Sequence, residues 1–334
     1  MRFGPARIWF RRLCFIFSCV AIIDLLMIWN SSLTDGLSPV EGWDEGVSRN
    51  VSDYVNELFK PRILPESFCQ DEKILMVMVC SRPDGFEIRR AIRDTWGQKH
   101  TNASVFFLVG EVKSRRLQNK LEAESEEFAD IIQERFVDTY NNLTLKSVHM
   151  LKVFKIYCAD TYKYLMKVDD DLYFNLDATV THLQHRPYQR NTLIGRVRSQ
   201  TAPYRGSSSK WYMPYKWYPD SIYPDFLCGP GYLMSADVVD KLFKCSLEVP
   251  LLHTEDVYLT GICSKYMGIK LTNNYRFTCN KNDSHVCLDP KAWTRHYYTA
   301  ATIRETYFIL KNNGCEKLKR YSVLMAWIFF LRHF

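Results

Sequence analysis

Three consecutive carboxylates interrupt an apolar run near the middle of the chain. Tyr164 to Val168 has the pattern of a short buried strand, and Asp169, Asp170 and Asp171 follow it directly. Carboxylates at the end of a buried strand are costly to bury unless a cation neutralises them. Since ligands of open α/β sheets bind beyond the carboxyl ends of the strands, this run could hold a divalent metal bridged to a diphosphate. A solvated turn or a loose Ca²⁺ loop is the alternative interpretation.

Apolar strands and amphipathic helices alternate up to this triplet. Residues 74–79 and 105–109 are continuous apolar runs of the kind found in buried strands, and a helical stripe over 145–158 leads into the strand at 165–168. Such alternation is typical of a parallel α/β sheet. The second half is less regular, so we expect a mixed α/β fold whose sheet has helices along its sides.

The N-terminus has the pattern of a membrane anchor followed by a spacer. We expect residues 1–12, which are rich in arginine, to form a cytoplasmic tail, and the apolar residues 13–29 to form a transmembrane signal-anchor. The polar residues 30–70 are then a lumenal stem, and 71–334 form the catalytic domain. A cleaved signal peptide is the alternative for the apolar segment.

Charge and cysteine content narrow the class of protein. The formal charge of +7 is mild and dispersed along the chain, so nucleic-acid binding is not indicated. Nine of the eleven cysteines follow the predicted anchor, and we expect several to pair in an oxidising compartment, with at least one left over. No C-x-x-C pair occurs, which argues against a structural zinc site. The sequence leaves open whether the chain forms a homo-oligomer.

Several short motifs occur in one order along the chain. They are Arg89-Arg-Ala-Ile-Arg-Asp-Thr-Trp-Gly97, Phe136-Val-Asp-Thr-Tyr-Asn-Asn-Leu-Thr-Leu-Lys146, Lys167-Val-Asp-Asp-Asp-Leu-Tyr-Phe-Asn175, Lys210-Trp-Tyr212, Tyr223-Pro224, Cys228-Gly-Pro-Gly-Tyr232 and Glu255-Asp-Val257. Over about residues 72–300 this ordered series resembles the β-1,3-galactosyltransferase and β-1,3-N-acetylglucosaminyltransferase family, which includes fringe-type enzymes.

The resemblance implies a GT-A type fold that binds a UDP-sugar and a divalent cation, usually Mn²⁺. It further implies an inverting transfer that forms a β-1,3 bond to a glycan acceptor on a glycoprotein or glycolipid, in a type II protein of the Golgi membrane. Galactose is the first choice of sugar, and N-acetylglucosamine is the alternative. A non-catalytic lumenal chaperone or lectin of the same fold is a second alternative, although this chain keeps its Asp triplet and Glu255-Asp256.

The same resemblance assigns the metal and the base. Asp171 is the expected metal ligand, with Asp169 and His296 completing the set; Asp169 also serves the ribose side and Asp170 the donor sugar. Hard oxygen ligands suit Mn²⁺ or Mg²⁺. Asp256 is the expected base that deprotonates the acceptor hydroxyl, with Glu255 as its alternative. A helix start also favours acidic residues through its dipole alone.

The remaining candidates are contacts to the donor and the acceptor. The nucleotide side comprises Ser81, Arg89, Arg93, Asp138 and Lys146, and the sugar pocket comprises Trp211, Gly229 and Gly231. Aromatic rings stack on sugars, and glycines let the backbone approach a ligand closely. For Arg93 a surface salt bridge is the alternative, and for the aromatic residue it is core packing.

Overall fold

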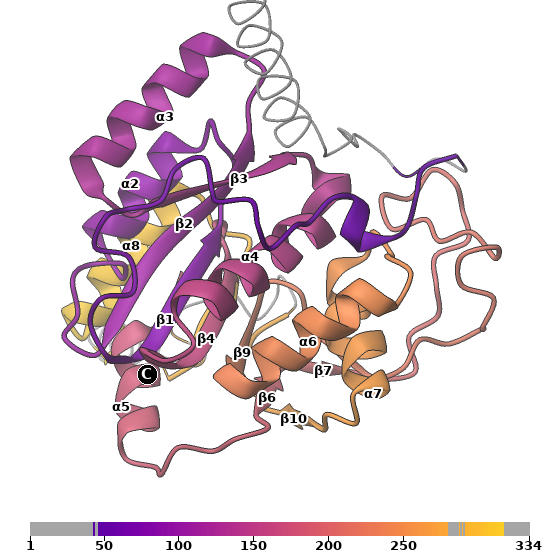
Figure 1. Cartoon of the computed structure of the whole chain (residues 1–334). Helices are drawn as coiled ribbons and strands as arrows, with labels where there is room; N and C mark the ends of the chain where they lie inside the picture. Colours follow the sequence, from indigo (N-terminus) through magenta and orange to yellow (C-terminus); the bar gives the residue numbers. More distant parts are fainter. Residues whose placement is uncertain (1–42, 44–45, 280–286, 288, 290, 317–334) are drawn as a thin grey trace, which may run out of the picture. The chain divides into compact units, whose positions relative to one another are not determined.

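A computed structural model describes residues 43, 46–279, 287, 289 and 291–316 (Figure 1). The predicted tail (1–12) and anchor (13–29) lie outside these residues. Within the described ranges, no helix combines the length and apolar character that a membrane crossing requires.

The centre of the domain is a seven-stranded sheet in the order β10-β6-β9-β4-β1-β2-β3. The strands are β1 (Lys73–Cys80), β2 (Ala103–Glu111), β3 (Ile131–Val137), β4 (Tyr162–Asp169), β6 (Leu193–Gly195), β9 (Gly231–Ser235) and β10 (Leu271–Asn273). All neighbours pair in parallel except at β9, which runs against both β4 and β6. The expectation of a mixed α/β fold with a mainly parallel sheet is therefore confirmed.

Helices cover both faces of the sheet, because side chains of a strand point alternately to one face and the other. On β1, Met76 and Met78 belong to one hydrophobic cluster, and Leu75, Val77 and Val79 belong to another. The first cluster contains buried residues of α4 (Leu143–Tyr157) and α6 (Ala236–Glu248). The second contains residues of α2 (Phe86–Asp94), α3 (Arg115–Phe128), α5 (Leu176–Gln184) and α8 (Ala300–Lys311). Figure 1 shows α4 and α6 side by side in front of the sheet.

Shorter elements complete the domain. They are two antiparallel ribbons, β5 (Leu172–Phe174) with β11 (Thr294–His296) and β7 (Val197–Arg198) with β8 (Phe226–Leu227), the 3₁₀ turns η1 (Val51–Asp53) and η2 (Tyr140–Asn142), the π-helix η3 (Val257–Cys263) and the short α7 (Ser264–Tyr266). The β5–β11 ribbon places His296 opposite Leu172. It therefore brings a residue from near the end of the chain beside the Asp triplet.

Residues 46–70, which belong to the lumenal stem predicted over 30–70, pack against the domain. Val51 and Tyr54 are buried in the cluster of α4 and α6, and the Arg49 Nε donates to the Leu251 carbonyl at 2.7 Å. Cys69 is joined to Cys158 by a disulfide. These few apolar residues show no regular period, so the sequence pattern did not reveal that they are core. The compact domain begins well before residue 71.

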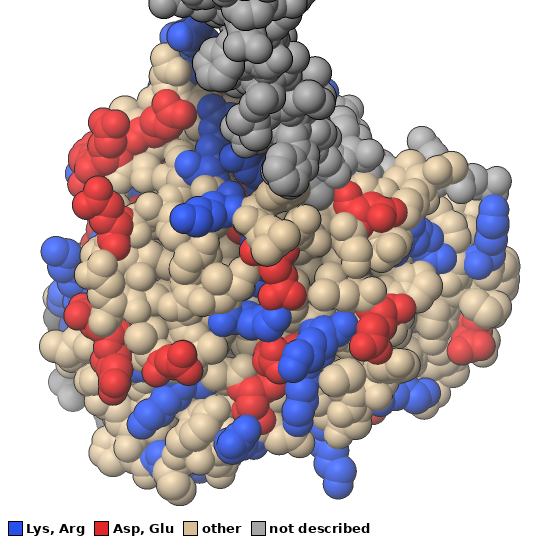
Figure 2. Space-filling view, in the orientation of Figure 1, with Lys and Arg blue, Asp and Glu red and all other residues tan. Residues whose placement is uncertain are grey.

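Two further disulfides join Cys228 to Cys279 and Cys287 to Cys315, while Cys80, Cys245 and Cys263 are buried thiols. The expectation that several cysteines pair and some remain is confirmed. Charges are mixed over the face seen in Figure 2, where acidic side chains gather over α3.

Candidate active site

The predicted residues meet along the edge formed by the carboxyl ends of β1 and β4. Cys80 pairs with Asp169 in the β1–β4 register, so the residues that follow these two strands lie side by side. The Ser81 hydroxyl donates to Asp170 Oδ2 at 2.8 Å. Burial raises the pKa of Asp170, and this hydrogen bond from Ser81 opposes that shift. Ser81 and Asp170 are thus held together at the carboxyl ends of β1 and β4.

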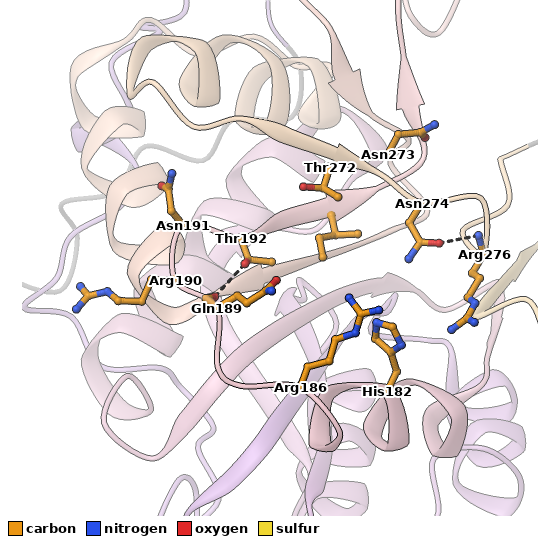
Figure 3. Close-up of a pocket in the computed structure, with 11 residues that line it drawn as sticks. His182, Arg186, Gln189, Arg190, Asn191, Thr192, Thr272, Asn273, Asn274 and Arg276 are labelled. Atoms are coloured by element: carbon orange, nitrogen blue, oxygen red, sulfur yellow. Dashed lines mark hydrogen bonds between the residues drawn. The ribbon is translucent and has the colours of Figure 1, made fainter.

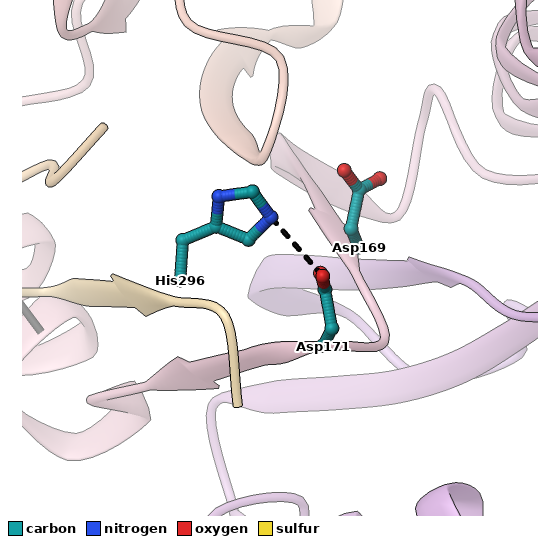
Figure 4. A group of neighbouring side chains, drawn as sticks. All are labelled: Asp169, Asp171 and His296. Atoms are coloured by element: carbon teal, nitrogen blue, oxygen red, sulfur yellow. Dashed lines mark ion pairs between the residues drawn. The ribbon is translucent and has the colours of Figure 1, made fainter. Parts of the chain in front are cut away.

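Asp169, Asp171 and His296 form a cluster with the character of a metal site (Figure 4). One ligand atom from each lies within 4.8 Å of the others, and His296 Nε2 is 3.1 Å from Asp171 Oδ2. Burial raises the pKa of Asp169, and the Lys167 ammonium opposes this rise. Two carboxylates and an imidazole, all partly exposed, are a donor set that fits Mn²⁺. The structure brings the three residues together as expected; the ion itself stays a prediction.

Lys167 joins this cluster to the second acidic pair. Its buried ammonium lies 2.6 Å from Asp169 Oδ1, 2.6 Å from the Gly229 carbonyl and 3.7 Å from Glu255 Oε2. Burial alone would lower the pKa of Lys167, but the carboxylates of Asp169 and Glu255 raise it above its ordinary value. This role was not predicted from the sequence. A lysine inside an apolar strand, two residues before an Asp run, was the available signal.

Glu255 and Asp256 have different surroundings although they are neighbours in sequence. Glu255 is 3% exposed, accepts a hydrogen bond from the Tyr232 hydroxyl and faces Lys167. Burial raises its pKa to about 7, against the opposing charge of Lys167. Asp256 is half-buried, and its Oδ1 accepts from the Val257 amide at 2.9 Å. Burial also raises the pKa of Asp256.

The glycine turn between β8 and β9 borders Asp256. A Cβ on Gly229 would lie 3.2 Å from Asp256 Oδ2, and a Cβ on Gly231 would lie 3.2 Å from Met166 Cε. The Asp169 amide donates to the Pro230 carbonyl at 3.0 Å, which fixes this turn to the end of β4. The backbone of this turn therefore lies between the Asp256 carboxylate and the cluster of Asp169, Asp171 and His296.

Lys146 connects Ser81 to the end of β3. Its ammonium is 2.8 Å from the Ser81 carbonyl and 2.8 Å from Asp138 Oδ1. The other oxygen of Asp138 accepts from the Gly110 amide at 2.7 Å. The predicted nucleotide-side residues Ser81, Asp138 and Lys146 thus form one connected network along the sheet edge.

Arg89 and Arg93 use their donors within the protein. Arg89 is fully buried and lies 2.6 Å from Glu124, and it also donates to the Ser81 hydroxyl at 3.1 Å. Arg93 lies 2.8 Å from Glu124 and 2.7 Å from Asp130. The alternative for Arg93 was a surface salt bridge; salt bridges are present, but they are largely buried. A direct nucleotide contact of either arginine stays a prediction, and it would require these pairs to open.

Trp211 belongs to an exposed aromatic group that includes Tyr140, two residues after Asp138 of the network. Its indole donates to the Tyr140 hydroxyl at 3.1 Å, and its ring centroid is 5.2 Å from that of Tyr204. The Lys210 ammonium lies 4.7 Å from the Trp211 ring centroid. All three rings are about half exposed, so core packing does not account for them. Tyr140 lies in the 138–140 region that the sequence assigns to the nucleotide, whereas Tyr204 was missed because it belongs to none of the quoted motifs.

The fold and this edge define a class of enzyme. The acidic side chains at the ends of parallel strands, the Glu255–Asp256 pair and the exposed aromatic group suit the transfer of a sugar from a charged, activated donor. The family model described as Galactosyltransferase matches residues 87–275. The chain belongs to this galactosyltransferase family, and it is a hexosyltransferase.

Relatives with assigned names agree with this membership. Beta-1,3-galactosyltransferase 1 of Mus musculus is 37% identical over 229 residues, which cover 66% of this chain and 69% of that protein. Beta-1,3-galactosyltransferase 2 of Mus musculus is 38% identical over 254 residues, covering 70% and 59%. Lactosylceramide 1,3-N-acetyl-beta-D-glucosaminyltransferase of Xenopus tropicalis is 33% identical over 311 residues, covering 85% and 80%.

Among solved structures, the galactosyltransferase LgtC with donor and acceptor sugar analogues has a TM-score of 0.37 and 10% identity, covering 70% of this chain and 95% of that one. A likeness of this degree does not assign a fold type, so the GT-A type stays a prediction.

Proposed function

We propose that this enzyme transfers galactose from UDP-galactose to a hydroxyl of a glycan acceptor, with inversion and with the help of a divalent cation, to form a β-1,3 bond. The observation that carries the proposal is the position of Lys167. Its ammonium contacts both Asp169 of the Asp–Asp–His cluster and Glu255 of the acid pair. The expected metal ligands and the Glu255–Asp256 pair, which contains the proposed base, thereby share one edge of the sheet, as a displacement reaction requires.

The donor end of the site is built from the Asp triplet and the network beside it. Asp169, Asp171 and His296 would hold the cation, which, when bound, offsets the negative charge that develops on the departing diphosphate. Ser81, Asp138 and Lys146 lie further along the same edge and face the nucleotide. Asp170 accepts a hydrogen bond from Ser81 and thereby orients it. The Asp170 carboxylate also receives a hydroxyl of the donor sugar.

Asp256 is the base in this proposal. It is more exposed than Glu255, and its Oδ2 is turned toward the glycine turn. A carboxylate whose pKa is raised by burial is a stronger base for the acceptor hydroxyl. Glu255 is enclosed by Tyr232 and Lys167, so it acts through the position of Lys167. The exposed rings of Tyr140, Tyr204 and Trp211 offer faces on which an acceptor sugar stacks.

Transfer of N-acetylglucosamine is the second candidate. It is favoured by the Xenopus tropicalis relative, whose match covers 85% of this chain. A panel of UDP-galactose, UDP-N-acetylglucosamine and UDP-N-acetylgalactosamine, each with Mn²⁺ and a glycan array, separates the candidates. We expect galactose transfer that stops when the metal is chelated. Equal turnover after chelation contradicts the role of the cation. The absence of turnover with every donor supports the chaperone or lectin alternative.

We further propose a type II topology in the Golgi membrane with the catalytic domain in the lumen. Its support is the arginine-rich segment 1–12 before the apolar segment 13–29, together with three disulfides in the domain. Protease treatment of sealed microsomes tests this topology. We expect the domain to be protected, whereas digestion from the C-terminal end without detergent contradicts it.

A further inference from the structure

A cavity of about 640 Å³, named the basic cavity, lies away from the active-site edge (Figure 3). It is lined by residues from α5, from the segment before β6 and from β10 and the turn that follows it. A neighbouring cavity of about 470 Å³ shares His182, Arg186 and Arg276 with it. The first cavity adds Arg190 and the second adds Lys291. Among the described residues, no Asp or Glu lines either cavity.

These positive charges are not neutralised by the part of the chain that the structure describes. Neither Arg186 nor Arg276 forms an ion pair there, and the Arg276 guanidinium instead lies 5.4 Å from the Trp293 ring centroid. Arg190 reaches Asp237 only at 3.9 Å, and its side chain is 78% exposed. Burial lowers the pKa of His182, and the nearby charges of Arg186 and Arg276 lower it further. Like charges gathered in one hollow repel each other, so an anion placed between them is stabilised.

The uncharged lining adds groups that recognise sugar hydroxyls. Asn191, Thr192, Thr272, Asn273 and Asn274 line the cavity beside the arginines. Amide and hydroxyl side chains both donate and accept hydrogen bonds, as sugar hydroxyls require. Figure 3 shows His182 of α5 next to Arg186, which follows the end of this helix, with Asn274 and Arg276 on the neighbouring segment. Volume and chemistry together suit one or two sugar units that carry a negative group.

The cavity is connected to the glycine turn of the active site along the β6–β10 edge. The Asn274 amide donates to the Gly195 carbonyl at 2.8 Å, at the end of β6. The next carbonyl, that of Arg196, accepts from the Cys228 amide at 2.8 Å, one residue before Gly229. The Arg196 guanidinium also lies 4.3 Å from the exposed ring of Tyr275. Hydrogen-bonded backbone therefore links Asn274 of the cavity to the glycine turn that borders Asp256.

We propose that this cavity is a subsite for an acidic sugar, bearing a sulfate ester or a carboxylate, within an extended acceptor glycan. The role as an acceptor subsite rests on the proposed function, whereas binding of the acidic sugar does not. Arg186 and Arg276 contact the anionic group, and the asparagine and threonine side chains contact the hydroxyls. A glycan that lacks the negative group still reaches the active site, but the cavity does not increase its affinity.

Calorimetry with the full-length protein tests the binding step. The probe is a sulfated disaccharide, compared with its desulfated counterpart, and saturating UDP and Mn²⁺ are present to occupy the donor site. We expect the sulfated probe to bind, and the Arg186→Gln/Arg276→Gln variant to bind it about tenfold or more weakly, since two charge-assisted hydrogen bonds are lost. Arg116→Gln, on an exposed position of α3, is the matched control and should bind as the unmodified protein does.

Three outcomes overturn the proposal. They are equal affinity of the double variant and the unmodified protein, equal affinity of the desulfated probe, and displacement of the probe by an equal concentration of inorganic sulfate, which would indicate a site for free anions. If the double variant does not fold, Arg186→Glu at a single exposed position tests the same contact, and equal affinity of that variant overturns the proposal as well.

A kinetic experiment tests the connection to catalysis. We expect the double variant to raise KM for a sulfated acceptor and to leave the rate with the matched neutral acceptor unchanged. An equal effect on both acceptors overturns the role as an acceptor subsite. If no acceptor is glycosylated by the unmodified protein, the proposed function fails, and calorimetry still decides whether the cavity binds acidic sugars.

Discussion

The carboxylate of Asp256 lies directly against the backbone of Gly229, where a methyl group on the glycine would stand 3.2 Å from Oδ2. Few Cβ atoms in proteins tolerate so close a contact with a fixed neighbour. The glycine thus sets the position of the proposed base and also places its own carbonyl 2.6 Å from Lys167.

Gly229→Ala should therefore displace Asp256 and lower the transfer rate about 10- to 100-fold, because small errors in the position of a catalytic group are costly. UDP binding should persist, since the nucleotide network is not touched. Gly206→Ala is the control, because nothing lies within 4 Å of a Cβ at that position. Initial rates under saturating donor measure the effect. A Gly229→Ala enzyme as fast as the control shows that this contact does not position the base.

Asp256→Asn should lower transfer by about 10²–10⁴-fold, the usual contribution of a general base, while UDP–Mn²⁺ binding survives. Glu255→Gln should have a smaller effect, since Glu255 is enclosed by Tyr232 and Lys167. Rates are compared with donor affinity measured by calorimetry. If Asp256→Asn transfers the sugar at a near-normal rate and Glu255→Gln does not, Glu255 is the base and Asp256 is not.

Asp171→Asn should weaken Mn²⁺ binding by at least about tenfold and reduce transfer accordingly, because a carboxylate ligand loses its charge. Electron paramagnetic resonance of free Mn²⁺ measures the binding. Asp177→Asn serves as the control, since that carboxylate lies on α5 and its side chain is 89% exposed. Unchanged Mn²⁺ affinity in Asp171→Asn removes this residue from the metal site.

Glu255 should make the stability of the protein depend on pH. Burial raises its pKa in the folded state to about 7, above its ordinary value of 4.5. The folded state thus holds this proton more tightly than the unfolded state. Its contribution to stability is complete below pH 4.5, declines between pH 4.5 and about 7 and is lost above that range.

Glu255→Gln removes this dependence. Relative to the variant, the unmodified protein should lose on the order of 3 kcal/mol of unfolding free energy between pH 5 and pH 8. Urea unfolding in the presence of a chelator measures the difference, and Glu126→Gln, at an exposed position on α3, provides the control. A constant difference across the pH range contradicts the raised pKa.

Arg89→Met should lower the unfolding free energy by about 2–4 kcal/mol, because it leaves the buried Glu124 with Arg93 as its remaining ion-pair partner among the described residues. Arg90→Met is a neighbouring control whose side chain is 53% exposed, and it should change stability by about 0.5 kcal/mol or less. Denaturant unfolding measures both. Unchanged stability of Arg89→Met together with weaker UDP binding would instead support the direct nucleotide contact.

The sequence analysis identified those site residues that lie at the end of a strand or in a short ribbon. The Asp triplet begins at the last residue of β4 and was found from its own motif. His296 was assigned by the family resemblance, and the β5–β11 ribbon brings it beside the triplet. Arg89 and Arg93 could not be resolved in the same way, because Glu124 and Asp130 approach them only when α2 and α3 pack together. A single sequence does not carry that information.

Other features depend on segments that are distant along the chain. Lys167 looked like part of a buried strand, and its role depends on the arrival of Gly229 and Glu255. The basic cavity joins α5 to the turn after β10, where His182 and Arg276 meet across more than ninety residues. Neither arrangement has a local signature, so both had to be seen in three dimensions.

The packing of residues 46–70 on the domain limits how far the enzyme extends from a membrane. If residues 13–29 cross the bilayer as proposed, residues 30–42 alone remain as a tether before Trp43. Thirteen residues reach at most about 45 Å when fully extended. So short a connection would keep Trp43 within that distance of the lipid surface, which would favour glycolipids and membrane-bound glycoproteins over acceptors in free solution.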